Sequence, residues 1–145
     1  MTTLRPFTFA GPYQELDRPW AVNNFLRDIL TGSDVRIHGD GSARRSYLYG
    51  SDAAWWTLAA VINGADGEVY NLGSAEPVTH LELVDLLSRQ AKIRPRVVLN
   101  TAPAKQTPLD ELYPDTSHTQ RSLGVTQTCS LEATLAKAHA WFAKS

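Results

Sequence analysis

The sequence is poor in the features that mark several protein classes. It holds one cysteine, Cys129, among 145 residues, and its formal net charge at pH 7 is −1. A lone cysteine cannot form an internal disulfide, which is typical of a protein in a reducing cytoplasm. A near-neutral charge argues against nucleic acid as a partner, because binding to a phosphate backbone needs a concentrated basic surface. We therefore expect a cytoplasmic protein that binds no nucleic acid.

Membrane, metal and hydrolase signals are also missing. No apolar stretch approaches membrane-spanning length, and no basic N-terminal region precedes an apolar core, so we expect no membrane partner and no signal peptide. The four histidines are scattered without metal-ligand spacing, which makes a zinc site improbable. No Gly-x-Ser-x-Gly nucleophile motif is present.

Extended and helical patterns alternate along the chain, which favours an α/β fold in one domain. Strands are expected over residues 4–9, 35–38, 45–49, 68–72 and 96–100, the last with Val97, Val98 and Leu99 inside. Helices are expected over residues 20–30 and 51–62, from Thr79 to before Pro95, from 116 or 117 to Gly124, and after Ser130. Proposed caps are Ser51, Ser130, Gly32 and the Thr79–Glu82 capping box.

The densest local signal is the stretch Gly39–Tyr49. Asp40-Gly41 favours a tight turn, which predicts a hairpin between the strands at 35–38 and 45–49. Alternation along the second strand would place Arg45, Tyr47 and Tyr49 on one side. A guanidinium beside two aromatic rings can grip a phosphate, although a solvated hairpin face with Arg stacked on Tyr is the commoner arrangement.

Several ordered motifs with matching gaps resemble the C-terminal half of the NAD-dependent nucleotide-sugar epimerase/dehydratase family, the extended short-chain dehydrogenases. The resemblance runs from about Leu4 to Trp141. It is carried by residues 5–13 (RPFTFAGPY), 24–32 (NFLRDILTG), 39–49 (GDGSARRSYLY), 52–54 (DAA) and 69–74 (VYNLGS).

The resemblance implies a particular architecture. Residues 1–145 would be one domain, the C-terminal substrate-binding part of an epimerase or dehydratase whose N-terminal NAD-binding half is absent. The fold expected is a small mixed α/β substrate-binding lobe. To it are added the last strands of an incomplete Rossmann-type sheet, formed by the strands at 4–9 and 68–72.

The resemblance also assigns roles to individual residues. Arg45 would grip the diphosphate of a nucleotide-sugar, and Asn71 would lie near the phosphates. The alternative for Asn71 is a turn residue at a strand end, with equal weight. The nucleotide base would be packed by Arg36, Ile37 and His38, although simple core packing is the stronger interpretation of Ile37. Arg44 does not align with the phosphate-binding arginine and is expected in solvent.

The sequence departs from the family pattern at three places. Thr8 replaces an asparagine that contacts the substrate phosphates in many members, and Trp20-Ala21 replaces a lysine-leucine pair at the start of the first helix. Leu112-Tyr113-Pro114-Asp115 stands where an Arg-Pro-Gly segment often supplies a late arginine. The phosphate grip therefore depends mainly on Arg45.

Family members use NAD for hydride transfer, with a glycine-rich turn for the cofactor and a Tyr-x-x-x-Lys base. No tyrosine in this sequence has a lysine four positions on, and Gly39-x-Gly41 lacks both a third glycine and a strand-to-helix context. We therefore expect NAD in the full-length parent and neither cofactor nor turnover in this chain alone.

Two functions follow from these expectations. The first is binding of the nucleoside-diphosphate part of a UDP-, dTDP-, CDP- or GDP-sugar within a longer epimerase or dehydratase. The alternative is a stand-alone, non-catalytic remnant that serves oligomerisation or ligand sensing. We also expect a homo-oligomer, because the first strand has an open edge and Trp20, Trp55 and Trp56 add apolar surface.

Overall fold

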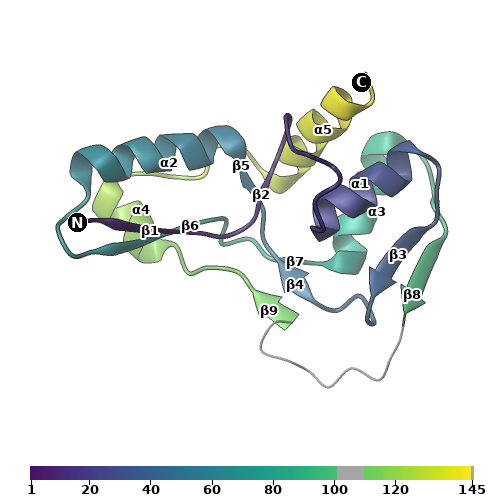
Figure 1. Cartoon of the computed structure of the whole chain (residues 1–145), viewed down its shortest axis with the longest axis horizontal. Coiled ribbons are helices and arrows are strands. Elements are labelled where there is room, and N and C mark those ends of the chain that lie inside the picture. Colours follow the sequence, from purple (N-terminus) through teal and green to yellow (C-terminus); the bar gives the residue numbers. More distant parts are fainter. Residues whose placement is uncertain (101–109, 145) are drawn as a thin grey trace.

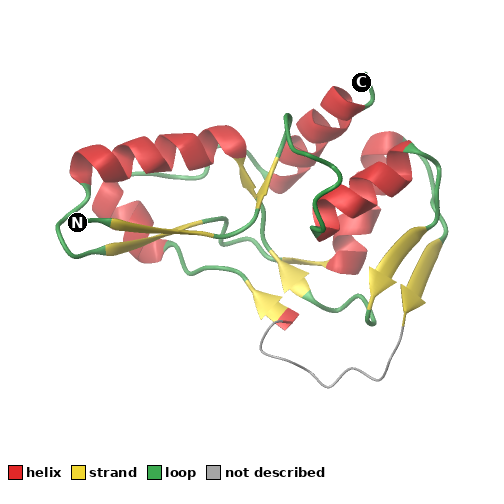
Figure 2. Cartoon of the chain, viewed as in Figure 1, coloured by secondary structure: helices red, strands yellow, loops and turns green. Residues whose placement is uncertain are grey.

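The computed structural model describes residues 1–100 and 110–144, which form a mixed α/β fold (Figure 2). The helices are α1 (Ala21–Leu30), α2 (Gly50–Asn63), α3 (His80–Ala91), α4 (Ser117–Leu123) and α5 (Leu131–Phe142). The strands are β1 (Thr3–Pro6), β2 (Phe9–Ala10), β3 (Val35–His38), β4 (Arg44–Arg45), β5 (Leu48–Tyr49), β6 (Val69–Leu72), β7 (Val78–Thr79), β8 (Val97–Asn100) and β9 (Glu111–Leu112).

The elements gather into two lobes with separate cores (Figure 1). In the first lobe, α2 and α4 pack against each other and against β6, around a core that includes Trp56, Tyr70 and Leu123. In the second lobe, α1, α3 and α5 pack together beside β3 and β8, around a core that includes Phe25 and Leu87. The short strands β2, β4, β5 and β7 join the two lobes.

The first lobe contains the strands that the family resemblance assigns to a Rossmann-type sheet. β1 and β6 run parallel, with Leu4 opposite Tyr70 and Pro6 opposite Leu72. Parallel neighbours need a long crossover, and here the crossover includes α1 and β3 of the second lobe together with α2. The expected α/β class is confirmed. The expected strand at 4–9 splits into β1, which shares a sheet with β6, and β2, which pairs with β5.

The expected hairpin between residues 35–38 and 45–49 is wrong. β3 pairs in parallel with β8, so that Ile37 lies opposite Leu99. The second half of the proposed hairpin splits into two: β4 pairs with β7 and β9, whereas β5 pairs with β2. Gly39 and Gly41 do take positive φ, but they turn the chain away from β3 and not back along it.

The helices were predicted well, and their ends less so. The Thr79 hydroxyl accepts from the Glu82 amide at 3.1 Å, and the Glu82 carboxylate accepts from the Thr79 amide at 2.7 Å, which confirms the capping box. Ser130 caps α5, as expected. Ser51 is not a cap, because α2 already begins at Gly50.

The Asp52 side chain links two segments that are far apart in the sequence. Its buried carboxylate accepts hydrogen bonds from the Thr128 hydroxyl and amide and from the Cys129 amide, at 2.5 to 3.0 Å. It therefore ties the start of α2 to the segment that leads into α5, 77 residues further along the chain. The three donors give this buried carboxylate the hydrogen-bond partners that a buried polar group needs.

Two burial expectations are also wrong. Val97 and Leu99 are not inside but 38% and 40% exposed, because β8 is an edge strand whose only partner among the described residues is β3. Trp56 is completely buried, and its indole N–H donates to the Thr126 carbonyl at 3.2 Å. Trp20 and Trp55 do reach solvent.

Two further features of the structure concern membrane-spanning helices and groups of metal-binding side chains. Within residues 1–100 and 110–144, no helix has the length and apolar character needed to cross a membrane. The same residues hold no cluster of three or more histidine, cysteine or acidic side chains suited to a metal ion.

Candidate functional site

A pocket of about 1090 Å³ opens between the second lobe and the short strands that join the lobes. The walls come from segments far apart in the sequence: the start and the outer side of α1, the turn into β3, alternate residues of β3, and the chain around β4. Its lining residues are Thr8, Pro19, Trp20, Ala21, Asn24, Phe25, Arg27, Asp28, Gly32, Ser33, Asp34, Arg36, His38, Arg45, Tyr47, His80 and Leu112.

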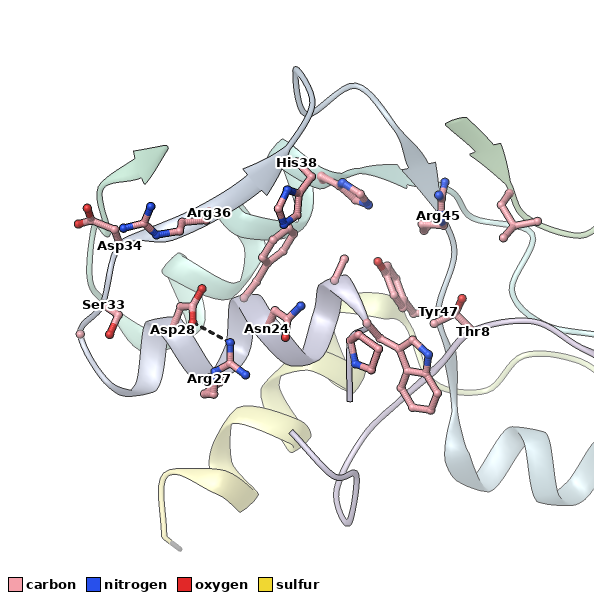
Figure 3. A pocket seen from close by; sticks show the side chains of 17 residues that line it. Thr8, Asn24, Arg27, Asp28, Ser33, Asp34, Arg36, His38, Arg45 and Tyr47 are labelled. Carbon is pink, nitrogen blue, oxygen red and sulfur yellow. Dashed lines mark hydrogen bonds and ion pairs between the residues drawn. The ribbon is translucent and has the colours of Figure 1, made fainter. Parts of the chain in front are cut away.

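Strand alternation decides which β3 side chains reach the pocket. Val35 and Ile37 are buried in the core of the second lobe, which turns Arg36 and His38 outward. Figure 3 shows Asp34 and Arg36 at one end of the pocket and Arg45 and Tyr47 at the other, with α1 running beneath. The pocket is therefore long enough to present charged groups at both ends.

Six of the eight residues proposed from the sequence line this one pocket: Thr8, Trp20, Ala21, Arg36, His38 and Arg45. Ile37 does not, because its side chain belongs to the core. Asn71 lies in the first lobe, where its side-chain amide donates to the Asp115 carbonyl at 2.9 Å and its own carbonyl accepts from Thr119. The structure thus does not bring Asn71 to the pocket.

Arg45 is partly buried and held by the backbone. Its Nη1 donates to the Arg44 carbonyl at 2.7 Å and to the Asp110 carbonyl at 3.3 Å. Arg44 does not line the pocket and is not simply solvated: its guanidinium lies 3.8 Å from a Glu111 carboxylate oxygen and 5.5 Å from the centre of the Tyr113 ring. The two adjacent arginines therefore have different surroundings, and only Arg45 faces the pocket.

The pocket also contains polar groups that the sequence did not assign. The Tyr47 side chain is only 2% exposed, and among the described residues its hydroxyl has no hydrogen-bond partner. Burial raises the pKa of the Tyr47 hydroxyl well above its ordinary value, against a smaller opposing effect of Arg45, so the group stays a neutral donor. Strand alternation in the sequence already places Tyr47 on the same side as Arg45, but it gives the hydroxyl no role.

His80 was not proposed from the sequence at all. It opens α3, and its ring meets the Phe25 ring edge-on at 5.7 Å between centroids. Burial and then the nearby Arg45 charge lower its pKa, so the imidazole is neutral at pH 7. No local pattern marks this residue, because only the packing of α3 against α1 and β4 brings it to the pocket.

The Gly39-x-Gly41 turn does not form a cofactor cradle. It leads from β3 into β4 and not into a helix, and a Cβ on Gly41 would lie 2.6 Å from Leu81 Cγ. The space beside this glycine is therefore filled by the start of α3. A pyrophosphate in a dinucleotide site needs that space open at a helix N-terminus, so these residues do not fit NAD.

Comparison with known proteins places the chain in a family. Residues 1–73 match the sequence profile of the NAD dependent epimerase/dehydratase family. The chain belongs to this family. A relative in Arabidopsis thaliana, UDP-glucuronate 4-epimerase 4, is 30% identical over 158 aligned positions, covering 98% of this chain and 36% of that protein. The chain thus spans well under half the length of the epimerase it matches.

Solved structures share the fold. The UDP-glucose 4-epimerase of Thermotoga maritima, solved with UDP-glucose, superposes with a TM-score of 0.85 at 28% identity, over 99% of this chain and 46% of that one. A UDP-glucuronic acid 4-epimerase mutant from Bacillus cereus superposes with a TM-score of 0.86 over 99% of this chain and 45% of that one. At 24% identity the latter supports the fold alone.

Proposed function

We propose that this chain binds the nucleoside-diphosphate part of a nucleotide-sugar, as the C-terminal substrate-binding part of an epimerase or dehydratase. One observation carries the proposal: six residues chosen from the resemblance, in four separate segments, line a single pocket. In this proposal Arg45 binds the diphosphate with a charge-assisted hydrogen-bond pair. Arg36 and His38 flank the base, and Thr8, Trp20 and Ala21 form the wall near the phosphates.

We propose that the parent protein also has a cofactor-binding part, and that this part is a partner of the present chain. The present residues supply neither a dinucleotide cradle nor a Tyr-x-x-x-Lys base. The role of this chain is then to hold and orient the substrate, while hydride transfer belongs to NAD bound by other residues.

The neighbouring arginines provide a matched test. We expect Arg45→Gln to weaken binding of UDP-sugars and dTDP-sugars at least tenfold, the loss expected when a hydrogen bond to a charged group is removed. Arg44→Gln should bind as the unchanged protein does, because Arg44 lies outside the pocket. Binding should be followed by NMR titration into the millimolar range and by calorimetry, with thermal unfolding to confirm that each variant folds.

Two results would contradict the proposal. Equal effects of the Arg44 and Arg45 substitutions would remove the assigned phosphate contact. Turnover of a nucleotide-sugar by the isolated chain, followed through NADH absorbance, would show that the catalytic machinery lies within these 145 residues.

A further inference from the structure

Neither ring nitrogen of His80 has a hydrogen-bond partner among the described residues, although both nitrogens are buried from solvent. Buried polar atoms are nearly always paired, and each unpaired one lowers the stability of the folded state. An imidazole held only for packing would be replaced by an apolar side chain without loss. His80 therefore has unused hydrogen-bonding capacity at a place where that capacity is costly.

The surroundings of His80 indicate where this capacity is directed. The residue lines the same pocket as Arg45 and Tyr47, and the Tyr47 hydroxyl is also buried and unpaired within the described residues. The Arg45 charge lies close enough to disfavour protonation of His80. One cation and two unpaired neutral polar groups thus share one region of the pocket.

These groups match the chemistry of a diphosphate. A phosphoryl group offers only acceptor oxygens at neutral pH, and it requires donors from several directions once Arg45 has taken one side. A neutral imidazole supplies one N–H donor, and a protonated phenol supplies another. The second imidazole nitrogen is an acceptor, which a hydroxyl group of the ligand can fill.

We infer that His80 is a ligand-binding residue of this pocket, whose ring N–H donates to a phosphoryl oxygen of the diphosphate held by Arg45. The inference rests on the proposed function and extends it to a residue at the start of α3, an element that the sequence did not assign to the site. Ligand binding then satisfies a polar group that the free protein leaves unpaired. His80 lowers the stability of the free chain and raises the affinity for the nucleotide.

Opposite effects on stability and binding provide the test. UDP and uridine serve as probes, because they differ in the diphosphate alone. We expect His80→Leu to weaken UDP binding about threefold to tenfold, the loss of one hydrogen bond, and to leave uridine binding unchanged. The same substitution should raise the unfolding temperature, because it removes two unpaired buried polar atoms.

Two further variants complete the design. His80→Gln keeps a donor and should retain part of the affinity for UDP. His139→Leu, on α5 and outside the pocket, makes the same chemical change and should leave UDP binding as it was. All titrations should use amide NMR shifts up to millimolar probe, so that weak binding is measured and not missed.

Each other result overturns the inference in a distinct way. If the unchanged protein binds UDP and His80→Leu binds it equally well, His80 makes no contact and the proposed function still stands. If His80→Leu weakens UDP and uridine alike, the contact is not to the diphosphate. If the unchanged protein binds neither probe, the proposed function fails and the inference falls with it.

Discussion

Protonation of His80 is opposed first by burial and then by the Arg45 charge, so its pKa is lowered in the folded chain. In the unfolded chain a histidine titrates near pH 6.5. Above that pH both states are neutral, and His80 makes no difference to the pH dependence of stability. As the pH falls below it, the unfolded chain takes up a proton that folded His80 resists, so the free energy of unfolding decreases. We therefore predict that acidification from about pH 7.5 to about pH 5.5 lowers stability in urea unfolding.

His80→Leu isolates this effect from the other ionisable groups. The variant keeps His38, His118, His139 and every carboxylate, so these groups contribute equally in both proteins. The stability advantage of His80→Leu should grow as the pH falls. Parallel pH profiles for the two proteins would show that His80 titrates normally in the folded state.

At the scale of elements, the turn between β3 and β4 positions the start of α3. The Gly41 carbonyl accepts from the Leu81 amide at 3.3 Å, and the Ala43 carbonyl accepts from the His80 amide at 3.1 Å. Gly41 is buried, has a φ of +83°, and leaves room for the Leu81 side chain. This contact fixes His80 relative to β4, so the turn controls the geometry of the pocket.

The turn offers two glycines for a matched comparison. Gly39 also has positive φ, but a Cβ there would meet nothing within 4 Å. Gly39→Ala should therefore cost only the backbone term, about 1–2 kcal/mol of unfolding free energy. Gly41→Ala should cost a further ~1–3 kcal/mol, because its methyl group displaces Leu81. Urea unfolding measures both, and equal losses would mean that Leu81 moves aside freely.

The elements show what local sequence can and cannot predict. Helix faces were readable because their apolar spacing is a local property: Val22, Phe25, Leu26 and Ile29 are all buried, as the spacing of α1 indicated. Strand partners could not be predicted from the local sequence. Asp40-Gly41 signals a reversal, but β3 finds its partner in β8, about sixty residues later in the chain. Pairing at that distance is decided by packing of the whole second lobe.

The same distinction applies to the site. Thr8, Arg36, His38 and Arg45 were named from motif resemblance, and the structure brings them to one pocket. Asn71 was named on the same grounds and lies in the other lobe, bonded to the Asp115 carbonyl. His80 carries no motif, since its place in the pocket arises from the packing of α3 against α1. Ligand contact remains a prediction for every one of these residues.

At the scale of the molecule, one apolar surface has no cover within the described residues. Trp55, Leu58, Val61 and Ile62 lie along the outer side of α2 and are between 53% and 78% exposed. We call these four residues the α2 face. Such a contiguous apolar surface is typical of an interface. In the proposed parent it would meet the cofactor-binding part.

The open edge of β1 is a weaker interface than the sequence suggested. The Thr3 amide donates to the Glu68 carbonyl, and the Phe7 amide donates to the Leu72 carbonyl of β6. Because backbone groups alternate along a strand, the nitrogens of Leu4 and Pro6 point away from β6, toward the open edge. Pro6 has no N–H, which leaves this edge poor in donors. A proline on an edge strand discourages pairing with another chain. The α2 face is therefore the better site for contact between copies.

We predict that the 145-residue chain self-associates reversibly through the α2 face, with a mass that rises with concentration in light scattering. Val61→Lys with Ile62→Lys should shift the protein to monomer, because two buried charges across an apolar contact cost several kcal/mol. Ile93→Lys, an equally drastic change at an exposed apolar residue after α3, should leave association unchanged. If instead Leu4→Pro disrupts association and the α2 double variant does not, copies pair through the β1 edge. A monomeric mass at high concentration for the unchanged chain would exclude both contacts, because the exposed apolar area of α2 would then be too small to hold two copies together.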